Sequence, residues 1–115
     1  MYQFSYAEIV EDTSSDTRAR EREAVERAVG LLRKAKAAGA RSRETVEALH
    51  FVRQLWAILI EDLASSENDL PQKLRADLIS IGLWVMREAE AIRMGQTEDF
   101  DAIIDINQTI AEGLK

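Results

Sequence analysis

Glu47 and His50 are the residues of this chain whose types and spacing come closest to a reactive site. The pattern Glu-x-x-His places both side chains on one face of a helix, as in bundles that bind two metal ions through carboxylates and histidines. Such a site needs a second Glu-x-x-His pair, and the chain contains a single histidine. A general base with an orienting carboxylate is the other possibility, but no nucleophile or glycine-rich phosphate loop accompanies it. We therefore expect a hydrogen-bonded structural histidine, with no metal and no catalysis.

Composition and charge exclude several classes of function. The sequence has no cysteine, which removes disulfides, thiolate zinc sites and cysteine nucleophiles. Fifteen basic and 21 acidic residues give a net charge of -6, which opposes binding to nucleic acids and to anionic lipids. The first residues do not resemble a signal peptide, and no apolar run is long enough to span a bilayer. With 115 residues, 46% of them hydrophobic, we expect one cytoplasmic domain over residues 1–115.

Four segments of the chain carry apolar residues at the spacing of an amphipathic helix. Gly39, Pro71 and Gly95 mark the breaks between them, and Pro71 suits the first position of the third helix. The candidates for helix caps are Ser42, Asn68, Asp69 and Thr97. The predicted helices cover residues 16–38, 42–64, 70–94 and 97–114. Short connections between long helices favour antiparallel neighbours. The predicted fold class is therefore all-α, an antiparallel helical bundle of about four main helices.

The helix predicted over residues 42–64 carries Glu47 and His50 on a narrow polar strip. Apolar side chains cover more than half of its circumference, namely Val46, Leu49, Val52, Leu55, Trp56, Leu59, Ile60 and Leu63. A helix that is apolar on so many sides is typical of the centre of a bundle. In the next helix Gly82 lacks a side chain, which indicates a close approach of a neighbouring helix.

Residues 1–13 form an aromatic N-terminal arm ahead of these helices. Ser5 and Glu8 fit a capping box for a short helix, whereas the alternation of aromatic residues fits an extended start. The polar stretch "EDTSSDT" that follows could let the arm move. Aromatic and apolar side chains anchor many interfaces, so the candidate partner-binding residues are Tyr2, Phe4, Tyr6, Ile9, Trp56 and Trp84. The alternative is that the arm and both tryptophans complete the core.

Three longer strings resemble the FlaF family of flagellar biosynthesis regulators of alphaproteobacteria: "MYQFSYAEIVED", "SRETVEALHFVRQLWAILIEDLA" and "LPQKLRADLISIGLWVMREAEAIRMG". The most specific elements are the opening "MYQFSYAE", "ALHF" followed by "LW" and "DLA", and "LRADLISIG" followed by "WV". The resemblance covers nearly the whole chain. Residues 13–17 and the end beyond Asp101 carry little of it.

This resemblance implies a cytoplasmic protein that is not an enzyme and has no cofactor. It implies a flagellin-binding export chaperone or adaptor that acts with a second regulator, FlbT, and couples flagellin synthesis and secretion to filament assembly. The flagellar type III export apparatus is a further implied partner. A helical bundle suits the role, because an apolar groove can hold an amphipathic helix of a subunit that is disordered before assembly.

Two other functions remain as alternatives. A post-transcriptional regulator could bind flagellin messenger RNA directly, and its support is the run of arginines and lysines over residues 18–36. Glutamates alternate with these basic residues, which is typical of a solvated helix face, and the net charge also argues against RNA binding. A di-iron or hydrolytic enzyme ranks last, for the reasons given for His50.

Overall fold

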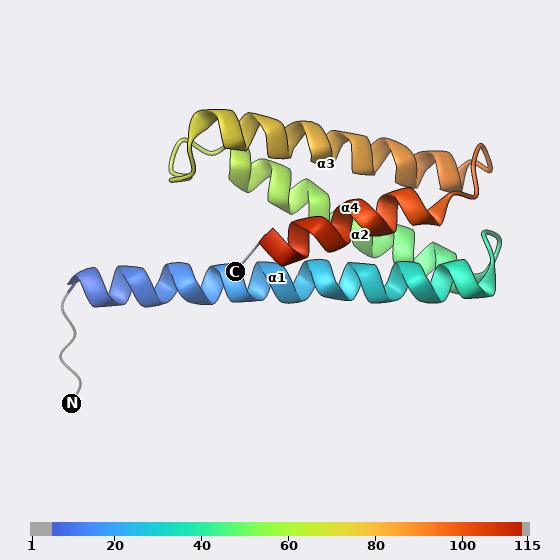
Figure 1. Ribbon diagram of the computed structural model, residues 1–115, viewed down its shortest axis with the longest axis horizontal. Coiled ribbons are helices and arrows are strands. Elements are labelled where there is room, and N and C mark those ends of the chain that lie inside the picture. Colours follow the sequence, from blue (N-terminus) through green and yellow to red (C-terminus); the bar gives the residue numbers. More distant parts are fainter. Residues whose placement is uncertain (1–5, 114–115) are drawn as a thin grey trace.

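The computed structural model describes the backbone of residues 6–113 and the side chains of residues 16–113. The described chain forms helices and no strand: α1 spans Tyr6–Ala38, α2 Arg43–Ala64, α3 Gln72–Arg93 and α4 Phe100–Gly113. Each helix runs opposite to the one before it (Figure 1). The predicted all-α helical bundle is confirmed.

The first helix is longer than predicted. An arm, a polar linker and a helix from Asp16 were expected, but α1 is continuous from Tyr6 to Ala38, so the expected linker is helical. Serine, threonine and aspartate lower helix stability by only about 0.7 kcal/mol or less per residue, and no glycine or proline occurs between residues 6 and 29. The N-terminal part of α1 consequently reaches past the other helices (Figure 1). Tyr2 and Phe4 lie outside the described residues.

The connection between α1 and α2 follows the sequence prediction closely. Gly39 ends α1 in the left-handed conformation, with φ at 104°, where a side chain would be strained. The Ser42 side chain accepts a hydrogen bond from the Thr45 backbone N–H and caps α2. The Ser42 and Thr45 hydroxyls both donate to the Gly39 carbonyl, at 2.6 and 2.7 Å. These bonds hold the turn and fix the start of α2.

The caps of α3 and α4 differ from the predicted ones. Pro71 occupies the N-cap of α3 instead of its first helical position, and it makes no side-chain cap hydrogen bond. In α4 the Asp99 carboxylate accepts from the Ala102 N–H, whereas the Thr97 hydroxyl accepts from the Asp99 N–H just before the helix. Asp99 therefore takes the capping role expected of Thr97, and its negative charge suits the positive end of the helix dipole.

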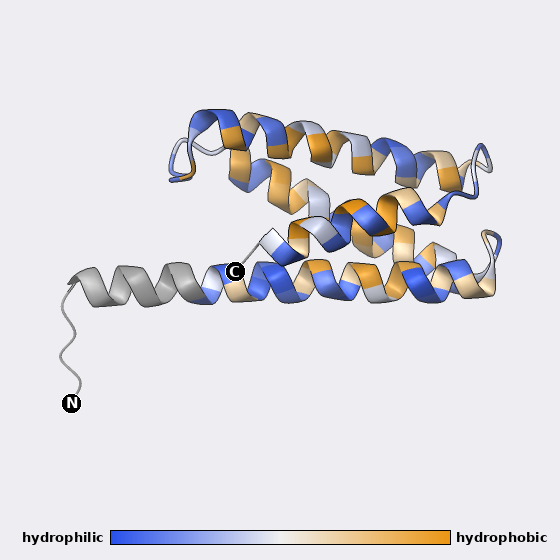
Figure 2. Ribbon diagram, in the orientation of Figure 1, coloured by the Kyte–Doolittle hydropathy of each residue, from blue (hydrophilic) through white to orange (hydrophobic). Residues whose placement is uncertain are grey.

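The apolar circumference of α2 predicted that it forms the centre of the bundle. It packs against both α1 and α3, but α1 likewise packs against two helices, α2 and α4. The central place is therefore shared by α1 and α2. The largest side chains with almost no exposure are Val25, Leu32, Val52, Trp56, Val85, Ile103 and Asn107. All four helices contribute apolar residues to this core, and apolar residues recur along the helices (Figure 2). Val46, expected on the apolar face, is 68% exposed.

At Gly82, α3 packs tightly against side chains of α2. A Cβ atom added there would lie 2.8 Å from Cε3 of Trp56 and 2.9 Å from Cγ1 of Ile60. Atoms at such distances repel, so any side chain at this position would displace the side chains of Trp56 and Ile60. The predicted close approach is confirmed.

Candidate functional site

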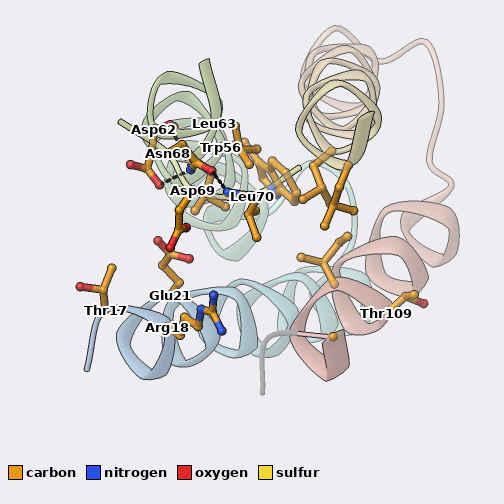
Figure 3. Close-up of a pocket in the computed structure, with 15 residues that line it drawn as sticks. Thr17, Arg18, Glu21, Trp56, Asp62, Leu63, Asn68, Asp69, Leu70 and Thr109 are labelled. Atoms are coloured by element: carbon orange, nitrogen blue, oxygen red, sulfur yellow. Dashed lines mark hydrogen bonds between the residues drawn. The ribbon is translucent and has the colours of Figure 1, made fainter. Parts of the chain in front are cut away.

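An apolar groove begins where α4 ends. It lies between α1, the C-terminal half of α2 and the N-terminal half of α3, and its volume is about 450 Å³ (Figure 3). Besides Trp56, its apolar walls are formed by Leu59, Leu63, Leu70, Leu74, Leu78 and Ile110. A concave surface with this lining can hold an apolar side of a ligand or of a partner helix.

Unequal helix lengths create this groove. The helix α4 has 14 residues, against 22 each in α2 and α3, and its last residue, Gly113, lines the groove. All buried residues of α3 lie at or beyond Gly82, so residues 72–81 include none. Leu74, in this stretch, is 44% exposed. The first half of α3 thus presents leucines to a space that α4 does not reach.

Arg75 fastens this half of α3 to the end of α2. Its Nη1 atom donates to the carbonyl oxygens of Leu63 and Ser65, at 3.4 and 3.2 Å. A cation at the C-terminal end of a helix satisfies free carbonyls and is favoured by the helix dipole. The far wall of the groove is therefore held in place although it contributes no buried residue to the core.

Asn68 organises the loop between α2 and α3. Its Nδ2 atom donates to the backbone oxygen and to Oδ2 of Asp62, at 3.2 and 3.3 Å, and its Oδ1 accepts from the Leu70 N–H (Figure 3). Asn68 and Asp69 were expected as candidate caps of α3. Instead, Asn68 closes the end of α2 and sets Asp69 and Leu70 at the rim of the groove.

The polar rim of the groove carries more negative than positive charge. Among the described residues, Glu21, Asp62 and Asp69 line it together with one cation, Arg18. Partial burial raises the pKa of Glu21 above its ordinary value, and repulsion by Asp62 raises it further, while Arg18 acts in the opposite direction. The rim thus holds a carboxylate whose charge is incompletely compensated.

Trp56 is a core residue that also lines the groove. Its side chain is 1% exposed, and its Nε1 atom donates to Oδ1 of Asn107 at 2.8 Å. The Asn107 Nδ2 atom donates in turn to the Ile103 carbonyl at 2.7 Å. One sign of this pair is visible in the sequence, an asparagine within the apolar stripe of α4, but the sequence does not identify the tryptophan as its partner.

The other candidate partner-binding residues lie elsewhere. Trp84 is half-buried and lines a second, more open hollow on α3 and α4, of about 440 Å³, which meets the groove at Thr109. Tyr6 and Ile9 belong to the first turns of α1, and their side chains are outside the described ones. Where the structure describes these candidates, it does not bring them together.

Glu47 and His50 lie on the solvent side of α2, both exposed. Glu47 pairs with Arg43 at 3.1 Å, and within residues 16–113 nothing hydrogen-bonds the His50 ring, so the expected structural hydrogen bond is absent there. Among the described residues, no group of three or more histidine, cysteine, aspartate or glutamate side chains could hold a metal ion.

Several basic residues of α1 are engaged within the protein. Lys36 pairs with Asp101 of α4 at 2.6 Å, and Arg22 approaches Glu26 at 3.8 Å. The Arg27 guanidinium lies over the Phe51 ring, 5.0 Å from its centroid. These contacts agree with the predicted solvated helix face, in which acidic and aromatic neighbours accompany the cations.

None of the helices over residues 6–113 combines the length and apolarity needed to cross a membrane.

Comparison with known proteins places the chain in one family. No curated protein and no solved structure matches the sequence. The family profile described as flagellar protein FlaF matches residues 2–114, essentially the whole chain. The chain therefore belongs to the FlaF family of flagellar proteins.

Proposed function

We propose that this protein is a cytoplasmic flagellin-binding export chaperone or adaptor that couples flagellin synthesis and secretion to filament assembly. Membership of the FlaF family supports a flagellar role. The observation that carries the finer proposal is the apolar groove of about 450 Å³ that begins at the end of α4. A FlbT-type regulator and the flagellar type III export apparatus complete the proposed set of partners.

The groove suits an amphipathic helix. A helix bound between α1, α2 and α3 would continue the place that α4 occupies in the bundle and would cover the exposed leucines of α3. Terminal helices of an exported filament subunit are amphipathic, and before assembly they have no partner that buries their apolar faces. Holding such a helix would keep the subunit from associating before export.

Direct binding to flagellin messenger RNA is not proposed. Its support in the sequence was the basic run of α1, and Arg22, Arg27 and Lys36 of that run have acidic or aromatic neighbours within the protein. Phosphate contacts require cations that are free to approach the backbone of the nucleic acid.

Two leucines of α3 provide a matched test. Leu74 lines the groove and is 44% exposed, whereas Leu83, 46% exposed on the same helix, lies outside it. Purification with co-expressed flagellin, followed by size-exclusion chromatography with mass measurement, should show a defined complex. Leu74→Asp should weaken flagellin binding by at least about 2 kcal/mol, on the scale of interface hot spots. Leu83→Asp should bind flagellin as tightly as the unsubstituted protein.

Circular dichroism would establish that both aspartate variants remain helical. Absence of any complex with the unsubstituted protein would overturn the proposal. Equal loss in both variants, with both folded, would move the flagellin site away from the groove.

A further inference from the structure

We propose that the groove selects its occupant by charge: the bound segment is an amphipathic helix that places a lysine or arginine between Glu21 and Asp69. The identification of flagellin as the natural source of this helix rests on the proposed function. The charge requirement rests on the residues of the groove themselves.

The acidic residues converge on the groove from two elements that are distant in sequence. Glu21 projects from α1 toward the α2–α3 loop, which carries Asp69, and Asp62 lies at the end of α2 on the same side (Figure 3). The Asn68 hydrogen bonds to Asp62 and to the Leu70 N–H hold the loop in this arrangement. The carboxylates are therefore positioned before any partner arrives.

The balance of charge at this rim is negative. Within residues 16–113, three carboxylates line the groove with one guanidinium, that of Arg18. Burial raises the pKa of Glu21, repulsion by Asp62 adds to this effect, and the attraction of Arg18 does not reverse it. A cation delivered by the partner would supply compensation beyond what Arg18 gives among the described residues, in a place where water is partly excluded.

The same charges disfavour two other occupants. The N-terminal segment of a second copy is apolar enough to enter the groove, but residues 2–12 contain Glu8, Glu11 and Asp12 and neither lysine nor arginine. A nucleic acid strand would bring phosphates to the acidic rim. Placing like charges together is how interfaces reject wrong partners, so a helix with a basic residue beside its apolar stripe fits best.

The first test uses flagellin and a pair of double variants. Glu21→Gln with Asp69→Asn neutralises the rim, and Glu23→Gln with Glu67→Gln removes two charges from the same helix and the same loop outside the groove. Affinity for flagellin, measured by calorimetry at low salt, should fall about tenfold in the first variant, because close charge pairs contribute to binding, and stay within about twofold in the second.

The second test is independent of flagellin. Two designed helical peptides share one leucine stripe and differ only in flanking lysine or glutamate. The unsubstituted protein should bind the lysine peptide at least about tenfold more tightly, since like charges repel across an interface. This preference should disappear in the Glu21→Gln, Asp69→Asn variant and persist in the Glu23→Gln, Glu67→Gln variant.

The two tests separate the inference from the proposed function. Equal binding of both peptides by the unsubstituted protein would overturn the charge requirement, and flagellin binding that is equal in the two variants would do the same while leaving the function intact. Discrimination between the peptides without any binding of flagellin would keep the inference and overturn flagellin as the partner. Failure to bind either peptide or flagellin would overturn both.

Discussion

Trp56 and Asn107 form a hydrogen bond in the core, with both side chains almost fully buried. A buried N–H that loses its acceptor costs about 1–3 kcal/mol, and the cavity left by a shortened side chain adds to this cost. Asn107→Ala should therefore lower the free energy of unfolding by about 3 kcal/mol, measured by urea denaturation. Its neighbour Gln108 is half-buried on the same helix, and Gln108→Ala should stay within about 0.5 kcal/mol of the unsubstituted protein. Equal effects would show that the indole finds another acceptor.

Glu21 should make stability depend on pH. Its pKa is raised in the folded protein, chiefly by burial and then by Asp62, so between the ordinary value of 4.5 and the raised value the folded state binds more protons than the unfolded chain. The free energy of unfolding should fall as the pH rises through this window. Glu21→Gln removes the ionised group and should raise the thermal midpoint at pH 7, with the advantage disappearing toward about pH 4.

Glu23→Gln, at an exposed position of the same helix, is the control for the loss of one charge. An advantage of Glu21→Gln that is the same at both pH values would contradict the role of the Glu21 carboxylate.

Single residues differed in how far their roles could be predicted. Ser42 and Gly82 act through local geometry, a cap and a missing side chain, and the sequence showed both. Asn107 depends on Trp56, 51 positions away, and Asn68 on how the loop turns back toward Asp62. Partners of this kind become visible only when the helices are placed relative to one another.

At the scale of elements, two glycines inside helices have opposite surroundings. A Cβ at Gly82 would lie 2.8 Å from Cε3 of Trp56, whereas a Cβ at Gly30 would have nothing within 4 Å. Gly30→Ala should stabilise α1 by about 0.5–1 kcal/mol through helix propensity. Gly82→Ala gains the same propensity but must displace the α2 side chains, which costs about 1–3 kcal/mol, so a net loss is expected.

Thermal and urea unfolding of the two alanine variants would measure this difference. Stabilisation of both would mean that α2 and α3 separate at little cost, contrary to the close contact at Gly82.

Helix positions followed from apolar periodicity, but the extent of α1 did not. The polar residues at 11–17 were interpreted as a linker because they favour caps and turns locally. Each of them weakens a helix only slightly, and the structure continues one helix through all of them. Composition therefore predicted a break that is absent from the structure. This stretch contains neither glycine nor proline, whereas Gly39 ends α1 and Pro71 precedes α3.

At the scale of the molecule, the candidate site results from a mismatch between elements. Leu59, Leu74 and Leu78 all belong to apolar stripes at helical spacing, and all three line the groove. Whether such residues face a neighbour or an open groove depends on where α4 stops relative to α2 and α3. Periodicity within one helix carries no information on this alignment, so the groove could not be located from the sequence.

The groove also predicts which part of α3 is less protected and where a partner acts. None of residues 72–81 is buried, so their backbone amides should exchange with solvent faster than those after Gly82, which belong to the packed core. A helix bound in the groove would cover Leu74 and Leu78. Flagellin should then slow exchange at residues 76–80 by at least about tenfold, because local opening would have to expel the partner.

Hydrogen exchange followed by mass spectrometry, with and without flagellin, would measure this effect. In Leu74→Asp the slowing should be lost, because a buried carboxylate in the apolar contact opposes binding. In Leu83→Asp the slowing should persist, since Leu83 lies outside the groove. Protection that appears instead around Trp84, in the hollow on the outer side of α3 and α4, would assign the flagellin site to that hollow and leave the groove without this partner.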